Sequence, residues 1–121
     1  KELSKLSINT IAIMSNDVIQ YPDDSFENMK LFAKNYDFLF PYLFDESQEV
    51  AKQYGAVCTP DIFGFNNKNL LCYRGRIDSG VMNSNNQKIG RELYNAMVKI
   101  KNDGIGPDKQ LNSFGCSIKW K

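Results

Sequence analysis

The stretch GAVCTPDIF, residues 55–63, places a cysteine two residues before a proline at the start of an apolar run. The run DIFGF that follows Pro60 is typical of a β-strand, and Gly55 has the position that commonly ends a helix. This junction predicts that Cys58, Thr59 and Pro60 lie at the mouth of a buried strand. Either the thiol or the Thr59–Pro60 peptide bond could then be the functional feature.

Strand and helix patterns alternate along the rest of the chain. The expected strands are residues 8–14, 40–44, 61–65 and 69–75, the last two as an antiparallel hairpin. The expected helices are residues 24–36, 45–55 and 89–104, with Asp24 and Asp45 as N-caps. Residues 80–90 are expected to form a polar surface loop. This order predicts an α/β fold with a mixed sheet and flanking helices in residues 1–104, followed by a C-terminal tail, residues 105–121.

Composition excludes several classes of function. The 121 residues carry a formal net charge of +1 with scattered lysines and arginines, so neither nucleic acid nor a membrane surface is an expected partner. No apolar run approaches the roughly 18 residues that span a bilayer. The chain contains no histidine, which excludes Ser-His and Cys-His nucleophile pairs and the usual zinc sites.

The three cysteines, Cys58, Cys72 and Cys116, are 14 and 44 residues apart. This spacing contains no CxxC motif, no metal-ligand pattern and no disulfide framework, which favours a reducing compartment such as the cytoplasm. A phosphate-binding glycine loop is also absent, so we expect no metal, flavin or nucleotide cofactor.

Four segments together carry a family resemblance: SNDVIQYPDDSFENMKLFA, FPYLFDESQEVAKQYGAVCTPDIFGF, LCYRGRIDS and GCSIKW. In these segments the chain resembles the peroxiredoxin-like members of the thioredoxin superfamily, relatives of the alkyl hydroperoxide reductase and thiol-specific antioxidant family. The resemblance implies a thioredoxin-like fold and a thiol-dependent oxidoreductase of antioxidant type. The substrate would be a small-molecule peroxide or a protein disulfide, and a thiol reductant protein would restore the enzyme.

One part of the family pattern is missing. The reactive cysteine of such proteins lies in a segment that would precede Lys1, so the fold is expected to be incomplete at its N-terminus and this chain alone inactive. The absent strand would leave a gap in the sheet, with exposed apolar faces on both sides. We therefore expect a longer chain or a homo-oligomer. The alternative function is a non-catalytic thioredoxin-like binding module.

The resemblance also implies that the Thr59–Pro60 bond is cis and that these two residues bind the substrate, because the backbone before the proline can pair with an extended segment. A trans bond at the start of an edge strand is the alternative.

Each candidate thiol has two interpretations. Cys58 is either an inert buried residue or a second thiol of the active site. Cys116 is either an exposed second thiol on a mobile tail or a residue covered by a tail that packs through Phe114, Ile118 and Trp120. Cys72 is expected to pack in the core.

Arg74 and Arg76 alternate around Gly75, so both side chains should point to one face of a strand end. There they would either stabilise a thiolate or remain ordinary solvated charges.

Overall fold

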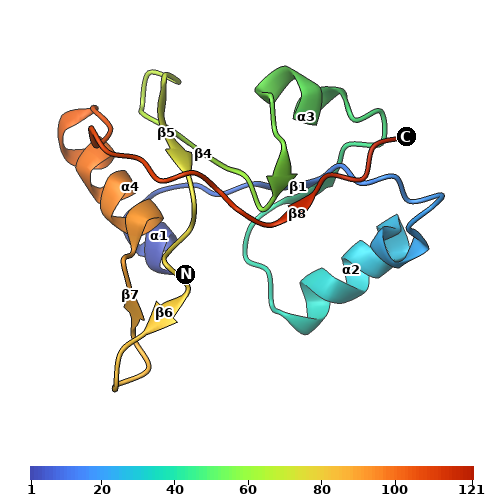
Figure 1. Cartoon of the computed structure of the whole chain (residues 1–121), viewed down its shortest axis with the longest axis horizontal. Helices are drawn as coiled ribbons and strands as arrows, with labels where there is room; N and C mark the ends of the chain where they lie inside the picture. Colours follow the sequence, from blue (N-terminus) through green and yellow to red (C-terminus); the bar gives the residue numbers. More distant parts are fainter. The chain divides into compact units, whose positions relative to one another are not determined.

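The computed structural model describes all 121 residues, which form two compact units. The first unit comprises residues Lys1–Val57 and Ser117–Lys121, and the second comprises Cys58–Cys116. Both combine short strands with helices (Figure 1), which confirms the α/β class. The single mixed sheet expected from the sequence is not present, because the strands pair as four separate two-stranded sheets.

The first unit contains helix α1 (Glu2–Lys5), strand β1 (Ala12–Met14), the 3-10 turn η1 (Pro22–Asp24), helix α2 (Phe26–Asn35), strand β2 (Tyr42–Phe44) and helix α3 (Glu49–Tyr54). Strands β1 and β2 are parallel, with Ala12 opposite Tyr42 and Met14 opposite Phe44. The expected strand at residues 8–14 is therefore too long.

Both helix starts in this unit differ from the prediction. Ser25 caps α2 by accepting a hydrogen bond from the Asn28 backbone N–H at 3.3 Å, whereas Asp24 lies in η1. Helix α3 begins at Glu49, four residues later than predicted, because Gln48 adopts a left-handed conformation with φ 64°. The predicted role of Asp45 is nevertheless confirmed, since its carboxylate accepts hydrogen bonds from the backbone N–H groups of Val50 and Ala51.

Buried Gln48 connects the C-terminus to the first unit. Its side chain is only 1% exposed, and its amide donates to the carbonyl oxygens of Ser15 at 2.8 Å and Lys119 at 2.9 Å. Its oxygen accepts from the Lys121 backbone N–H, while Ile118 is buried in the same unit. The end of the predicted tail is thus part of a folded unit.

The second unit contains strands β3 (Cys58–Thr59), β4 (Ile62–Phe65), β5 (Leu71–Gly75), β6 (Val81–Met82) and β7 (Lys88–Ile89), helix α4 (Glu92–Asp103) and strand β8 (Cys116–Ser117), whose second residue is assigned to the first unit. The predicted hairpin is confirmed: β4 and β5 are antiparallel, with Ile62 opposite Gly75. Helix α4 packs on this hairpin and buries Tyr73, Ala96 and Ile100.

The prediction of a loop at residues 80–90 is wrong. Strands β6 and β7 form a second hairpin there, with Val81 opposite Ile89. The Asn83 side chain accepts hydrogen bonds from the backbone N–H groups of Asn85 and Gln87, so the asparagine-rich segment is the turn between the two strands. Helix α4 consequently begins at Glu92 rather than at residue 89.

Candidate functional site

Cys58 and Thr59 form strand β3 in the second unit, directly before a cis peptide bond between Thr59 and Pro60. The predicted cis bond is confirmed. The Cys58 thiol is half-buried and lies 3.6 Å from the Pro60 carbonyl oxygen, to which it donates a weak hydrogen bond. Cys58 is therefore neither fully buried nor freely exposed.

An ion pair on the neighbouring hairpin lies close to this thiol. The Arg74 guanidinium on β5 contacts the buried Asp61 carboxylate, with 3.1 Å between Nη2 and Oδ2. The same guanidinium lies over the ring of Phe63, its partner across the β4–β5 ladder, at 4.9 Å from the ring centroid. These two contacts hold the Arg74 charge at a defined position.

The environment of Cys58 disfavours its thiolate. Burial is the main cause that raises the pKa of the Cys58 thiol, and the negative charge of Asp61 raises it further. The positive charge of Arg74 lowers the pKa in part without reversing the direction. Asp61 was not singled out from the sequence, although its place directly after Pro60 and next to a strand start could have suggested a neighbour of the thiol.

Arg74 and Arg76 form ion pairs with different carboxylates. Arg76 lies beyond the end of β5, and its guanidinium forms an ion pair with Glu92 in the first turn of α4 through both Nε and Nη2. Its carbonyl oxygen accepts a hydrogen bond of 2.6 Å from the Tyr73 hydroxyl. Arg74 is thus an electrostatic neighbour of Cys58, whereas the Arg76 guanidinium is paired with Glu92.

Strand β3 is already paired. It forms a two-stranded sheet with β8, and the Thr59 hydroxyl donates to the Cys116 carbonyl oxygen at 3.2 Å. The Gly115 backbone approaches the Thr59 carbonyl oxygen so closely that a Cβ at position 115 would overlap it. The Thr59 backbone, which the sequence predicted to be open to substrate, is thus contacted by the chain's own C-terminal segment.

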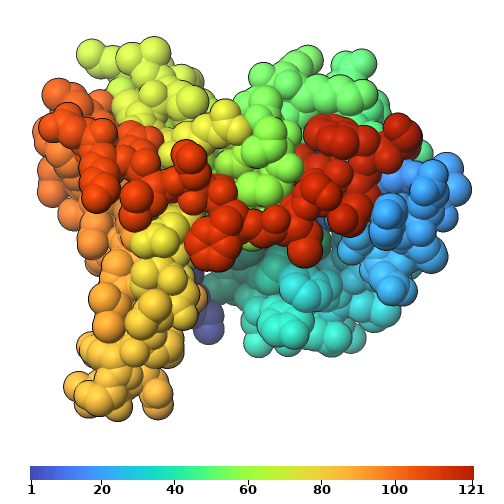
Figure 2. All heavy atoms as spheres, in the orientation of Figure 1, coloured from blue at the N-terminus to red at the C-terminus, as the bar shows by residue number.

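Residues 105–116, called the strap below, run along β5. Leu111 accepts a hydrogen bond from the Arg76 backbone N–H at 2.9 Å, and the Ser113 hydroxyl donates to the Gly75 carbonyl oxygen at 2.6 Å. Gln110 bridges Cys72 and Arg74 through its side-chain amide. Figure 2 shows the strap, in the orange-red part of the colour scale, at the surface of the second unit.

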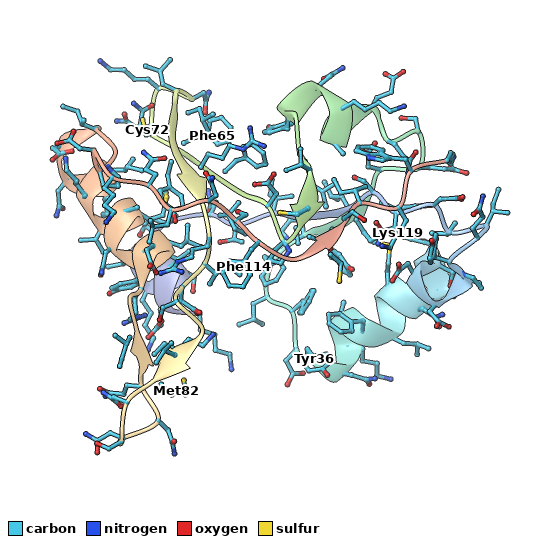
Figure 3. The ribbon with its side chains drawn as sticks, viewed as in Figure 1. Tyr36, Phe65, Cys72, Met82, Phe114 and Lys119 are labelled. Carbon is cyan, nitrogen blue, oxygen red and sulfur yellow. The ribbon has the colours of Figure 1, made fainter.

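Neither interpretation of Cys116 describes the structure fully. The strap is hydrogen-bonded along β5, yet Cys116 is exposed and Phe114, which Figure 3 labels, is 66% exposed. Cys72 is half-buried rather than a core residue, and its thiol lies 3.6 Å from the Gly104 carbonyl oxygen. All three cysteines are free thiols.

The first unit contains a concave surface of its own. A depression of about 540 Å³ in the first unit is lined by residues 43–47, Val50 and Lys121. One of its two carboxylates, Asp45, accepts hydrogen bonds at the start of α3, and the other, Glu46, is exposed. No group of three histidine, cysteine, aspartate or glutamate side chains is arranged to hold a metal ion, and no helix is long and apolar enough to cross a membrane.

Comparisons with known proteins extend over nearly the whole chain. No protein-family model and no curated protein matches it. A crystal structure of an uncharacterized conserved protein from Geobacillus kaustophilus is 43% identical over 99% of the chain, with a TM-score of 0.87. A crystal structure of a hypothetical protein from Sinorhizobium meliloti is 36% identical over 99%, with a TM-score of 0.86. The chain spans 64% and 66% of the lengths of these two proteins.

Proposed function

We propose that the complete protein has a thioredoxin-like fold and is a thiol-dependent oxidoreductase of the peroxiredoxin-like type. It reduces a small-molecule peroxide or a protein disulfide. The observation that carries this proposal is the half-buried Cys58 thiol at β3, beside an arginine whose position is held by Asp61 and Phe63. The sequence resemblance in GAVCTPDIF and GCSIKW supports the choice of family.

The raised pKa of Cys58 supports a division of roles. A primary nucleophile needs a thiolate near neutral pH, and the neighbours of Cys58 do not provide one. In our proposal a cysteine N-terminal to Lys1 is the primary nucleophile, and Cys58 or Cys116 is the second thiol. Thr59 and Pro60 form the substrate-binding edge.

The proposed reaction has three steps. The primary thiolate attacks one oxygen of the peroxide, the O–O bond breaks, and the leaving oxygen takes a proton to become an alcohol or water. The resulting sulfenic acid condenses with the second thiol, which forms a disulfide and releases water. A thiol reductant protein then exchanges with this disulfide, restores both thiols and becomes oxidised itself.

A turnover assay of the complete protein tests the proposal. Peroxide and disulfide reduction are measured with a thiol reductant for the wild type and for Cys58→Ser, Cys116→Ser and Cys72→Ser. We expect Cys58→Ser or Cys116→Ser to lower turnover about tenfold or more, because a protein without its second thiol cannot form the disulfide that the reductant restores. Cys72→Ser is the matched control, expected to keep full turnover. Absence of both activities in the wild type would refute the proposal.

A second function is favoured by the same electrostatics. Because no neighbour lowers the pKa of Cys58 below that of an ordinary thiol, the β3 edge could instead serve a non-catalytic thioredoxin-like module that binds an extended partner. Partner binding that survives Cys58→Ser together with Cys116→Ser, in a protein without turnover, would identify this module.

A further inference from the structure

A glutamine side chain closes the outer edge of β5. One edge of this strand pairs with β4, and the Cys72 carbonyl and the Arg74 backbone N–H point to the other edge. There the Gln110 side-chain oxygen accepts from the Arg74 N–H at 2.8 Å, and its nitrogen donates to the Cys72 carbonyl oxygen at 3.0 Å. Gln110 thus occupies the place that a peptide group of a third strand would have.

The strap holds Gln110 in this position. The Gln110 amide nitrogen also donates to the Pro107 carbonyl oxygen at 3.1 Å, within the strap itself. At Gly106 the strap lies so close to β5 that a Cβ would overlap the Cys72 carbonyl oxygen. Figure 1 shows the strap, in orange-red, passing across the end of β5. The docking of the strap on β5 therefore places the Gln110 amide.

The Gln110 contact fixes the backbone from which the Arg74 side chain extends. That side chain is 42% exposed, so its position depends on directed contacts more than on burial. The guanidinium lies 3.1 Å from the Asp61 carboxylate and 4.9 Å from the centroid of the Phe63 ring. A connected path of contacts thus leads from the strap, through Arg74, to the surroundings of the Cys58 thiol.

Two charged residues act on the Cys58 thiol in opposite directions. Asp61, which follows the cis-proline, disfavours the thiolate, and Arg74 on β5 favours it. Cys116, on the paired strand β8, is the other thiol near this junction. A movement of Arg74 away from Cys58 would leave the Asp61 charge in place, so the pKa of the Cys58 thiol would rise further.

We propose that Gln110 is a positioning residue that holds Arg74 beside Cys58, and that the docking of the strap on β5 thereby regulates the reactivity of this thiol. With the strap docked, the guanidinium is held at the thiol. With the strap released from β5, Arg74 loses its backbone support and Cys58 becomes less reactive. This inference deepens the proposed function, on which it rests for the role of Cys58 as a second thiol.

Alkylation of Cys58 in the complete protein tests the inference without any turnover. Gln110→Met removes the amide that bonds to β5 and keeps a side chain of similar length. Iodoacetamide labelling of the peptide that contains Cys58 is quantified by mass spectrometry as a function of pH, separately from the Cys116 peptide. The midpoint of the rate profile should rise, and the rate at pH 7 should fall about threefold, because it follows the thiolate fraction.

The same substitution in an Arg74→Met background separates positioning from a general loosening of the fold. Because Gln110 acts through Arg74, we expect Gln110→Met to move the midpoint only where Arg74 is present. A midpoint that Gln110→Met leaves unchanged in the wild type, or moves equally in both backgrounds, would overturn the inference.

Ser113→Ala is the matched control. It removes another hydrogen bond between the strap and β5, the 2.6 Å bond from the Ser113 hydroxyl to the Gly75 carbonyl oxygen, but keeps the Gln110 amide. We expect its alkylation midpoint to equal that of the wild type. A rise as large as that of Gln110→Met would overturn the role assigned to Gln110.

A second variant keeps the test independent of the folding of the first. Gln110 is exposed, so we expect Gln110→Met to fold, which circular dichroism checks. Gly106→Ala displaces the start of the strap from β5 and should also raise the midpoint. Should Gln110→Met not fold, an unchanged midpoint in Gly106→Ala would overturn the inference by itself. A protein that shows these shifts but reduces neither peroxide nor disulfide would refute only the proposed oxidoreductase.

Discussion

Burial and two neighbouring charges determine the pKa of the Cys58 thiol. Burial and the Asp61 carboxylate favour the neutral thiol, whereas the Arg74 guanidinium favours the thiolate. Asp61 and Arg74 also form an ion pair with each other, so a change in either one alters both the field at the sulfur and the position of the other. The pKa of Cys58 therefore depends on burial and on two residues, Asp61 and Arg74, whose opposite effects can be separated by substituting each one.

The pH dependence of Cys58 alkylation should move in opposite directions in two variants. Arg74→Met removes the charge that lowers the Cys58 pKa, so the midpoint of the rate profile should rise. Asp61→Asn removes a charge that raises the pKa, so the midpoint should fall. Iodoacetamide labelling followed by mass spectrometry measures both midpoints. Each variant also carries Cys72→Ser and Cys116→Ser, so that Cys58 is the cysteine of this chain that is labelled. Shifts of the same sign would contradict this account.

Asp45 should make folding stability depend on acid pH. Burial raises the pKa of its carboxyl, but hydrogen bonds from the Ala51 backbone, the Ser15 hydroxyl and the Val50 backbone outweigh burial and lower the pKa. A folded-state pKa below the unfolded value stabilises the fold above about pH 4. This stabilisation is lost as the pH falls through the folded-state pKa.

Asp45→Asn should therefore cost about 1 kcal/mol of unfolding free energy at pH 7, because a neutral amide oxygen accepts weaker hydrogen bonds from the Val50 and Ala51 backbone than the carboxylate does. The difference in unfolding free energy between this variant and the wild type should shrink as the pH is lowered below about 4, because the wild-type carboxyl then becomes neutral as well. Urea unfolding at pH 7, 5 and 3 measures this difference. Glu46→Gln, which neutralises the neighbouring exposed carboxylate, is the control. A difference that stays constant down to pH 3 would exclude the linkage.

At the scale of elements, helix α4 and the β4–β5 hairpin form the core of the second unit. Tyr73 on β5 is buried against a helix face that includes Ala96, Met97 and Ile100. Gly64 lets the helix approach closely, since a Cβ there would be 2.7 Å from the Met97 sulfur. This packing holds the hairpin that carries Arg74.

Removal of a buried side chain from this face should destabilise the second unit strongly. Ile100 is 3% exposed, so Ile100→Ala should cost about 2 to 5 kcal/mol of unfolding free energy. Ile105, which follows the helix and is 64% exposed, offers the same substitution as a control with an expected change of about 0.5 kcal/mol or less. Urea unfolding monitored by circular dichroism compares them, and equal costs would show that α4 does not form the core.

At the scale of the whole molecule, the parallel pair β1–β2 exposes apolar side chains on one face. Ile13 and Leu43 are direct partners in the ladder and are 44% and 48% exposed, and Ile11 on the same face is more exposed still. Contiguous apolar surface of this kind marks a contact site for another segment or molecule.

The 121-residue chain by itself should therefore bind the apolar dye ANS. Ile13→Thr combined with Leu43→Thr should reduce the dye fluorescence and any concentration-dependent association seen by size-exclusion chromatography. Ile19→Thr, at an exposed position outside the strands, is the control and should change neither. A monomer without dye binding would contradict this interpretation.

Much of the local structure could be predicted from the sequence. The capping role of Asp45, the end of α3 at Gly55, the β4–β5 hairpin and the cis Thr59–Pro60 bond are all confirmed. The hairpin at residues 80–90 differs from the predicted loop because its strands have only two residues each and an asparagine-rich turn dominates the segment. Each confirmed feature depends on only a few consecutive residues, whose backbone geometry and side chains determine the local structure.

The sequence by itself thus determined the α/β class and the junction at Cys58 to Pro60, because these depend on local periodicity and turn chemistry. Only the tertiary structure decided which groups surround the thiol. Asp61 and Arg74 lie 13 residues apart, and Thr59 meets Cys116 across 57 residues. No local pattern records such long-range contacts, which form only when the hairpin and the strap pack together. The same packing placed the chain's own Cys116 against Thr59.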